Sequence, residues 1–164
     1  MEMIQLCQSP FNVHAIAVAE DKEKPLIALN YGNPLIGLDI AWAIANALAD
    51  LHRMGIMHRD VKSTLLWLAP EVLNGQKYSY SYDIYSFGIV LAALDTLQKP
   101  YYHIKGKVSN ITQEIQDNQI RPKLSDNCNL WLKDLFIRCT THEPNLRQQL
   151  KKSLKCFHNE LRKL

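Results

Sequence analysis

The sequence predicts a mainly α-helical domain of the α+β class, with one short β-hairpin near its N-terminus. Apolar residues recur at helical spacing in five segments after residue 37. Strand-like composition occurs only between residues 13 and 29. The chain has 164 residues, of which 47% are apolar, and this is enough for a single hydrophobic core.

The hairpin is the first element expected. Residues 13–19 are rich in Val, Ile and Ala, and residues 26–29 are again apolar. The charged segment 20–25 between them is expected to form the connecting loop. Because two isolated strands are only marginally stable in water, the hairpin needs another element to pack on.

The first helix is expected over residues 38–53. Its polar residues Asp39, Asn46 and Asp50 are spaced by seven and four positions, so they share one stripe. The rest of its circumference is apolar, which is typical of a helix buried in a larger bundle. Gly55 is suited to end this helix in a left-handed conformation.

Four further helices are expected. The second runs from about residue 82 to residue 94, with Ser81 as its cap. A short amphipathic helix follows, with Ile111 and Ile115 four positions apart. The last two helices carry regularly spaced apolar residues, which are Leu132, Leu135, Phe136 and Cys139 in one and Leu146, Leu150, Leu154, Phe157 and Leu161 in the other.

The net charge of +3 is concentrated at the end of the chain. Residues 145–164 contain six basic residues and one acidic residue. The favoured interpretation is a solvated helix face, with cations near the negative end of the helix dipole. An acidic protein, a membrane surface and nucleic acid are the alternative ligands. We expect protein partners and no nucleic acid.

Cysteine spacing and hydropathy indicate a soluble cytoplasmic protein. No two of the four cysteines have the C-x-x-C spacing of a zinc or redox site, so no metal site is expected. The N-terminus has neither a basic region nor a long apolar stretch, and so does not read as a signal peptide. The most apolar segment, residues 87–94, is too short to span a bilayer.

Four motifs occur in a fixed order. Residues 56–63 read I-M-H-R-D-V-K-S, residues 67–73 read W-L-A-P-E-V-L, residues 82–88 read Y-D-I-Y-S-F-G, and residues 143–147 read E-P-N-L-R. Together they resemble the C-terminal lobe of the protein kinase superfamily, and specifically the tyrosine-kinase-like (TKL) serine/threonine kinases. The resemblance covers roughly residues 11–160.

The resemblance implies catalytic ancestry for the H-R-D-V-K segment. Asp60 would be the carboxylate that accepts the proton of the substrate hydroxyl, and Lys62 would neutralise charge on the transferred phosphoryl group. Arg59 would pair with a phosphate on the activation segment. His58 completes the motif and is expected to be structural.

The other matching residues would be structural or bind nucleotide. Asp83 would accept hydrogen bonds from the catalytic-loop backbone, and Glu71 and Arg147 would form a buried ion pair. The hinge that meets adenine would contain, besides Leu29, the residues Asn30, Tyr31 and Gly32. The implied organisation is an N-terminal extension over 1–10, a small-lobe hairpin and hinge remnant over 11–32, and a kinase-like C-lobe helical bundle over 33–160.

Several groups that the family uses for ATP and magnesium have no match. Leu65 stands where the catalytic-loop asparagine would hold a metal ion, and no D-F-G occurs. Only four residues separate Lys62 from Trp67, where a kinase has its D-F-G and activation segment. No glycine-rich loop and no V-A-I-K lysine are found. We therefore expect a pseudokinase-like fragment that binds neither ATP nor magnesium productively.

Two alternatives stay open. Besides a pseudokinase-like fragment, the chain could represent an abbreviated form of an active serine/threonine kinase. The other alternative is a helical protein-interaction module without nucleotide chemistry. A bundle without its small lobe would also expose apolar surface. Self-association through that surface is therefore expected.

Overall fold

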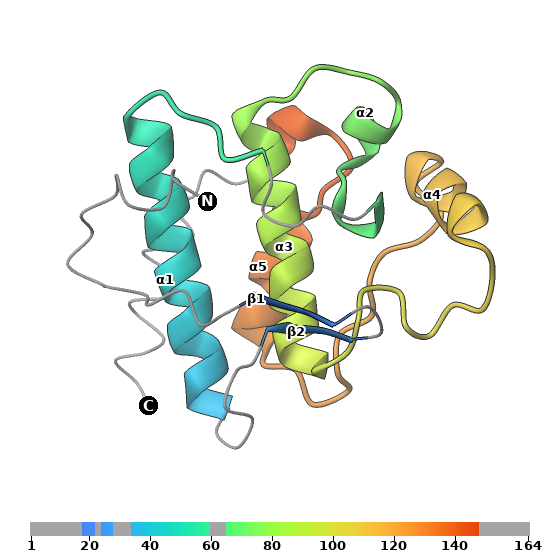
Figure 1. Ribbon diagram of the computed structural model, residues 1–164, viewed down its shortest axis with the longest axis horizontal. Coiled ribbons are helices and arrows are strands. Elements are labelled where there is room, and N and C mark those ends of the chain that lie inside the picture. Colours follow the sequence, from blue (N-terminus) through green and yellow to red (C-terminus); the bar gives the residue numbers. More distant parts are fainter. Residues whose placement is uncertain (1–17, 22–23, 28–33, 60–64, 148–164) are drawn as a thin grey trace.

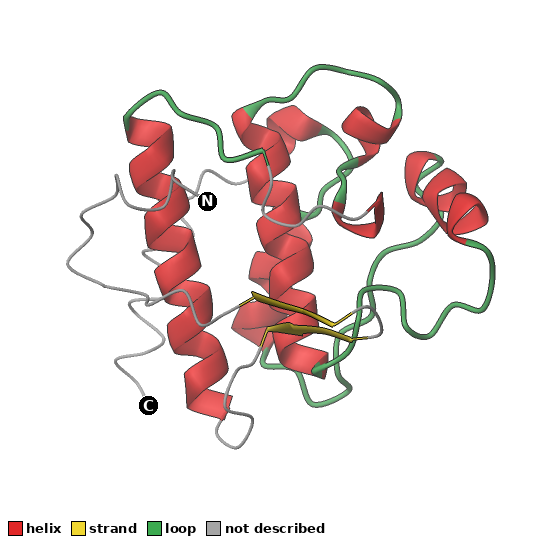
Figure 2. Cartoon of the chain, in the orientation of Figure 1, coloured by secondary structure: helices red, strands yellow, loops and turns green. Residues whose placement is uncertain are grey.

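The computed structural model describes residues 18–21, 24–27, 34–59 and 65–147. Within these ranges the secondary structure is mostly helical (Figures 1 and 2). The elements in chain order are β1 (Val18–Asp21), β2 (Lys24–Ile27), α1 (Pro34–Arg53), η2 (Leu65–Trp67), α2 (Pro70–Leu73), α3 (Tyr80–Thr96), α4 (Val108–Gln116), α5 (Leu130–Cys139) and η3 (Pro144–Leu146), where η denotes a 3-10 turn. The mainly α prediction is confirmed, and the arrangement is that of a kinase-like C-lobe.

The two strands form an antiparallel hairpin, as expected, but the predicted loop was too long. Val18 pairs with Ile27 and Asp21 pairs with Lys24, so most of segment 20–25 belongs to the strands. Glu20 pairs with Pro25 as well, so the charged residues do not form a wide loop. Residues 13–17 and 28–29 of the predicted strands lie outside the described residues.

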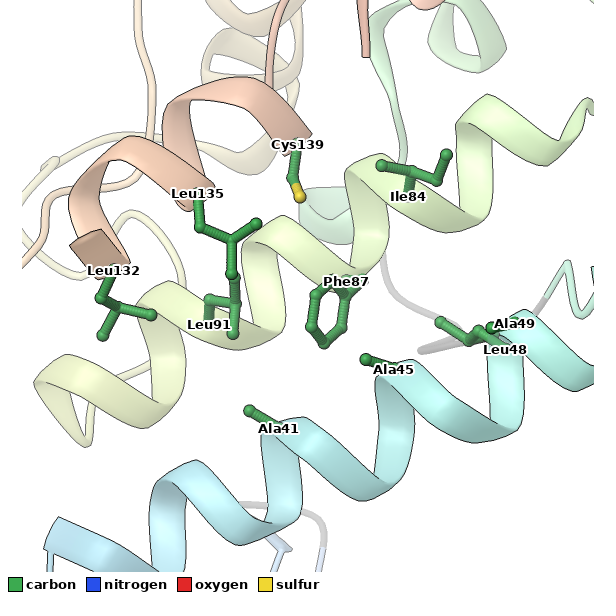
Figure 3. Close-up of a cluster of buried hydrophobic side chains, with 10 residues drawn as sticks. All are labelled: Ala41, Ala45, Leu48, Ala49, Ile84, Phe87, Leu91, Leu132, Leu135 and Cys139. Atoms are coloured by element: carbon green, nitrogen blue, oxygen red, sulfur yellow. The ribbon is translucent and has the colours of Figure 1, made fainter. Parts of the chain in front are cut away.

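Helix α3 is the centre of the structure. Every residue from Tyr82 to Ala92 is buried, including the polar residues Asp83 and Ser86. Helix α1 lies along one side of α3 and α5 lies along the other (Figures 1 and 3). Phe87 projects from α3 toward Ala41 and Ala45 of α1, whereas Leu132, Leu135 and Cys139 project from α5 toward α3 (Figure 3).

The expectations for the first two large helices need correction. In α1 the fully buried residues are Ala41, Ala45, Leu48 and Ala49, so one stripe is enclosed rather than most of the circumference. Helix α3 begins at Tyr80 rather than after Ser81, because Ser79 has the extended backbone of a cap residue. It ends at Thr96, and the next residue, Leu97, has a left-handed φ of 54°.

Close packing of α3 against α5 depends on Gly88. A Cβ atom at this position would lie 2.6 Å from Thr140 Cγ2 and 2.9 Å from Cys139 Cβ. Both distances are shorter than van der Waals contact, so only glycine allows the helices to approach this closely.

Two smaller clusters complete the core. One joins α3 to the segment before it and contains Trp67, Ala69, Tyr82, Tyr85, Ile89 and Val90. The other is built from Tyr101 and the two isoleucines of α4, Ile111 and Ile115, which are buried as predicted. Leu132, Leu135, Phe136 and Cys139 of α5 are buried as well. Nearly all of the predicted last helix lies outside the described residues. Leu146, expected on its apolar side, lies instead in the 3-10 turn η3 and is 70% exposed, so this part of the prediction was wrong.

Within the described part of the chain, no helix combines the length and the hydropathy needed to cross a membrane.

Candidate functional site

The loop that follows α1 is fixed by a single buried carboxylate. Asp83 is completely buried at the start of α3. Its Oδ2 accepts a hydrogen bond from the backbone N–H of His58 and its Oδ1 accepts one from the N–H of Arg59, both at 2.9 Å. The Nε2 atom of His52, near the end of α1, lies 2.8 Å from Oδ2. A charged acceptor makes such bonds stronger than neutral ones.

These contacts hold the loop in an unusual backbone conformation. Arg59 has a φ of 62°, in the left-handed region that a residue with a side chain seldom adopts. Gly55, at the beginning of the loop, has a φ of 76°, as its predicted role as a helix stop requires. His58 and Arg59 are exposed. Asp83 therefore fixes the backbone of the loop at residues 58 and 59.

The residues with expected chemical roles follow directly in sequence. Asp60 and Lys62 lie outside the described residues, as do Asn30, Tyr31 and Gly32 of the expected hinge. Their catalytic and nucleotide-binding roles stay predictions. The described chain resumes at Leu65, whose side chain in η2 is 54% exposed.

A second buried contact joins distant parts of the chain. Arg147 Nη1 donates to Glu71 Oε1 at 2.6 Å, and Nη2 donates to Glu71 Oε2 at 2.7 Å. The other three N–H groups of the guanidinium donate to the carbonyl oxygens of Thr141, Ser81 and His142. All five donors of an arginine are thus used, which compensates for the desolvation of its charge. The guanidinium also lies 4.9 Å from the centroid of the Tyr85 ring.

The segment before α2 is attached to α3 by a third contact. Ser86 Oγ donates a hydrogen bond to the backbone carbonyl of Trp67 at 3.1 Å, and both groups are buried. Since Trp67 and Ala69 also pack against Tyr82 and Tyr85, the A-P-E segment has a fixed position on α3. Glu71 follows in the first turn of α2, where it reaches Arg147.

Comparison with known sequences identifies the family. Residues 61–157, more than half of the chain, match the family described as protein tyrosine and serine/threonine kinase. The chain belongs to the protein kinase superfamily. Among its curated relatives is a probable serine/threonine-protein kinase of Dictyostelium discoideum, which is 31% identical over 142 residues. This alignment covers 67% of the kinase-like chain and 10% of the relative.

Two other relatives give the same result. Mitogen-activated protein kinase kinase kinase 7 of Homo sapiens is 32% identical over 101 residues, which cover 62% of the chain and 16% of that protein. The dual specificity protein kinase shkA of Dictyostelium discoideum is 36% identical over 86 residues, which cover 52% of the chain and 16% of that protein. The kinase-like chain thus spans less than a fifth of the length of each of these relatives.

The alignment with the probable serine/threonine-protein kinase of Dictyostelium discoideum also indicates an internal difference in length. The alignment is 142 residues long, but it covers only 67% of this chain of 164 residues, which is fewer than 142 residues. The relative therefore contains residues, within the aligned region, that have no counterpart in this kinase-like chain.

Motif reasoning missed three side chains that shape the site. His52 contacts Asp83 from α1, 31 positions away, and no sequence spacing points to this pair. Ser86 lies three positions after Asp83 in an otherwise apolar helix, so the two polar residues share a face of the helix. This spacing could have indicated that Ser86 has a polar partner. Tyr85 is bonded to Tyr101 through their hydroxyl groups, 3.5 Å apart. Burial raises the pKa of both phenols above its ordinary value, so both stay protonated at neutral pH.

The described residues do not offer a metal site of the usual kind. They contain no group of three or more His, Cys, Asp or Glu side chains arranged around a common point. Leu65, which replaces the metal-binding asparagine of the family pattern, has no ligand atom in its side chain. The residue types at this place do not fit the binding of magnesium.

Proposed function

We propose that this chain is a catalytically inactive, pseudokinase-like member of the TKL group whose role is to bind proteins. The observation that carries the proposal is the short connection between Lys62 and Trp67. Its last residues, Leu65 and Leu66, belong to η2, and Trp67 is bonded to Ser86. This connection is internal, so no residues added at either end would lengthen it.

Chain length alone excludes an ordinary activation segment here. Four extended residues span at most roughly 14 Å, which is too little for two strands, a D-F-G and a substrate-binding loop. The probable serine/threonine-protein kinase of Dictyostelium discoideum has residues within the aligned region that this chain lacks, which supports a deletion in this chain.

The missing groups are those on which phosphoryl transfer depends. Kinases position ATP and neutralise its charge with two magnesium ions, held by the D-F-G aspartate and the catalytic-loop asparagine. With Leu65 in place of the asparagine and no D-F-G, Asp60 and Lys62 would act without the metal ions and are proposed to be vestigial. Arg59 would likewise have no activation-segment phosphate to bind. We propose that the chain binds no productive ATP–magnesium complex.

The contacts that remain are those that hold the domain together. Asp83 still fixes the loop backbone, and Glu71 still pairs with Arg147. Neither contact needs nucleotide. This combination supports a folded protein-binding domain. We propose that it consists of an N-terminal extension over 1–10, a small-lobe hairpin and hinge remnant over 11–32, and a kinase-like C-lobe over 33–160. We also propose a cytoplasmic location, because the cysteine spacing in the sequence does not call for an oxidising compartment.

The second candidate is an abbreviated form of an active serine/threonine kinase. It is favoured by the intact H-R-D-V-K sequence and by the Asp83 contacts that hold its backbone. In that case a longer version of the same chain, with an insertion after Lys62, would phosphorylate protein substrates.

Nucleotide binding by this chain tests the first candidate, and the same assay on a version lengthened after Lys62 tests the second. The purified chain is titrated with a fluorescent ATP analogue with and without magnesium, and then incubated with radiolabelled ATP and a generic protein substrate. We expect no magnesium-dependent increase in affinity and no phosphate transfer. Metal-dependent binding, together with transfer that disappears in Asp60→Ala, would overturn the proposal. Sedimentation velocity on the same sample tests the proposed self-association, because a concentration-independent monomer would contradict it.

A further inference from the structure

The segment between α3 and α4 carries an unbalanced positive charge. Lys99, Lys105 and Lys107 are all exposed, and so is His103. No Asp or Glu occurs between Asp95 and Glu114, so the formal charge of this stretch of sequence is positive. In Figure 1 the segment leaves the end of α3 and runs along the outside of the molecule to α4. An exposed cationic segment of this kind attracts anionic ligands.

The same segment exposes apolar side chains among the lysines. Leu97 is 57% exposed, and Tyr102 and Val108 are each 47% exposed. Solvent exposure of one large apolar residue is ordinary, but three of them, together with three exposed lysines, within twelve positions give the segment a mixed apolar and basic character. Such a surface fits a ligand with both negative charge and apolar groups. We call residues 97–108 the basic loop.

Two features of the basic loop lower the stability of the folded protein. Leu97 and Tyr101 have φ values of 54° and 60°, in the left-handed region where residues other than glycine are strained. Lys107 immediately precedes the first turn of α4, at the positive end of the helix dipole, where a cation is destabilising. Strained backbone of this kind occurs preferentially at functional sites.

The basic loop is also held in one shape. The Tyr101 side chain is buried and contacts the Tyr85 hydroxyl on α3. The N–H of Tyr102 donates to the carbonyl of Lys99 at 3.2 Å, and the N–H of Ile104 donates to the carbonyl of Tyr101 at 2.9 Å. A preformed surface loses less conformational entropy on binding than a flexible one.

We propose that the basic loop is a docking surface for an acidic peptide segment, carrying apolar side chains, of a partner protein. The apolar residues decide between ligand classes, since leucine and valine match an aliphatic side chain but offer nothing to a sugar–phosphate backbone. The loop also has no arginine, the side chain best suited to bind phosphates. This inference does not depend on nucleotide binding, so it stands or falls separately from the proposed inactivity.

The experiment measures the binding of a fluorescein-labelled peptide of alternating Glu, Asp and Leu residues to the full chain by fluorescence anisotropy. Lys105→Glu combined with Lys107→Glu is expected to weaken binding by about tenfold, because two attractive contacts become repulsive. The matched control is Lys77→Glu with Lys133→Glu, which makes the same change in net charge at exposed lysines outside the loop. It is expected to change the affinity by less than about twofold.

The apolar contribution is tested by Leu97→Asn. Asparagine tolerates the left-handed backbone, so this change removes the apolar surface without disturbing the fold. A loss of about threefold in affinity is expected, with an unchanged circular dichroism spectrum. Equal losses for the two lysine pairs, no binding by the unmodified chain, or tighter binding of a single-stranded oligonucleotide or of anionic vesicles than of the peptide would each overturn the proposal.

Discussion

Arg147 and Glu71, which lie 76 positions apart, form a buried ion pair joined by two parallel hydrogen bonds of 2.6 and 2.7 Å. The pair connects the A-P-E helix to the segment after α5, and it also fixes the start of α3 through the Ser81 carbonyl. Since both side chains are almost inaccessible to water, each charge depends on the other.

The first prediction concerns this ion pair. Arg147→Ala is expected to lower the free energy of unfolding by about 3–5 kcal/mol, because it leaves the Glu71 carboxylate buried without a partner. Urea denaturation followed by circular dichroism measures the change. Arg138→Ala is the control, since Arg138 pairs with Asp134 on the exposed surface of α5 and should contribute less than about 1 kcal/mol. Equal stability of the two variants would contradict the prediction.

Asp83→Asn tests how the loop after α1 is fixed. The substitution keeps the shape of the side chain but replaces one acceptor oxygen with a donor, so an N–H of either His58 or Arg59 loses its partner. A stability loss of about 1–3 kcal/mol is expected. Hydrogen exchange should show faster exchange of the amides at residues 58 and 59. Unchanged exchange there, with Asp126→Asn as an exposed reference, would rule out this role for Asp83.

The glycine at the crossing of α3 and α5 gives a third prediction. Gly88→Ala places a methyl group within 3 Å of Thr140 and Cys139, so the helices must separate. We expect a loss of about 1–3 kcal/mol. Gly106→Ala is the matched control, because no atom lies within 4 Å of a Cβ at that position and its φ is not left-handed. If thermal unfolding gives the same midpoint for both variants, the close approach of the helices is wrong.

The fourth prediction concerns Cys128. Burial, with the Asp95 carboxylate nearby, raises the pKa of this thiol from 9.0 to about 11. Because only the thiolate reacts, the alkylation rate at pH 8 should be between about tenfold and hundredfold lower than that of an unperturbed cysteine. Mass spectrometry after timed treatment with iodoacetamide measures the rate at this residue. The rate should still rise steeply between about pH 10 and 11, whereas a plateau near pH 10 would show that the pKa is not raised.

Patterns in the sequence were sufficient for much of the fold. The helices around Ile111 and Leu135 were predicted because their apolar residues follow one clear period, and such residues must face the core. The start of α3 was misplaced since three serines, Ser79, Ser81 and Ser86, lie in or near its first turns and any short polar residue is able to cap. The one-sided burial of α1 depends on which neighbours are present, and periodicity does not contain that information.

The candidate site was predictable only where a motif supplied both partners. The Glu71–Arg147 pair and the Asp83 contacts are present in the structure at the positions that the kinase motifs indicate. His52 was not predictable, because its distance from Asp83 follows from how α1 packs on α3. The roles of Asp60, Lys62 and the hinge residues stay predictions.

The hydrogen bond from Ser86 to Trp67 has a consequence for how this domain tolerates change. It attaches the chain to α3 just downstream of the short connection, so the position of everything that follows is set independently of the number of residues upstream. An insertion between residues 62 and 65 would therefore form a loop outside the core without displacing α2 or α3. The same anchor serves a long or a short connection, so gain or loss of the intervening segment in evolution would require no change in the rest of the helical bundle.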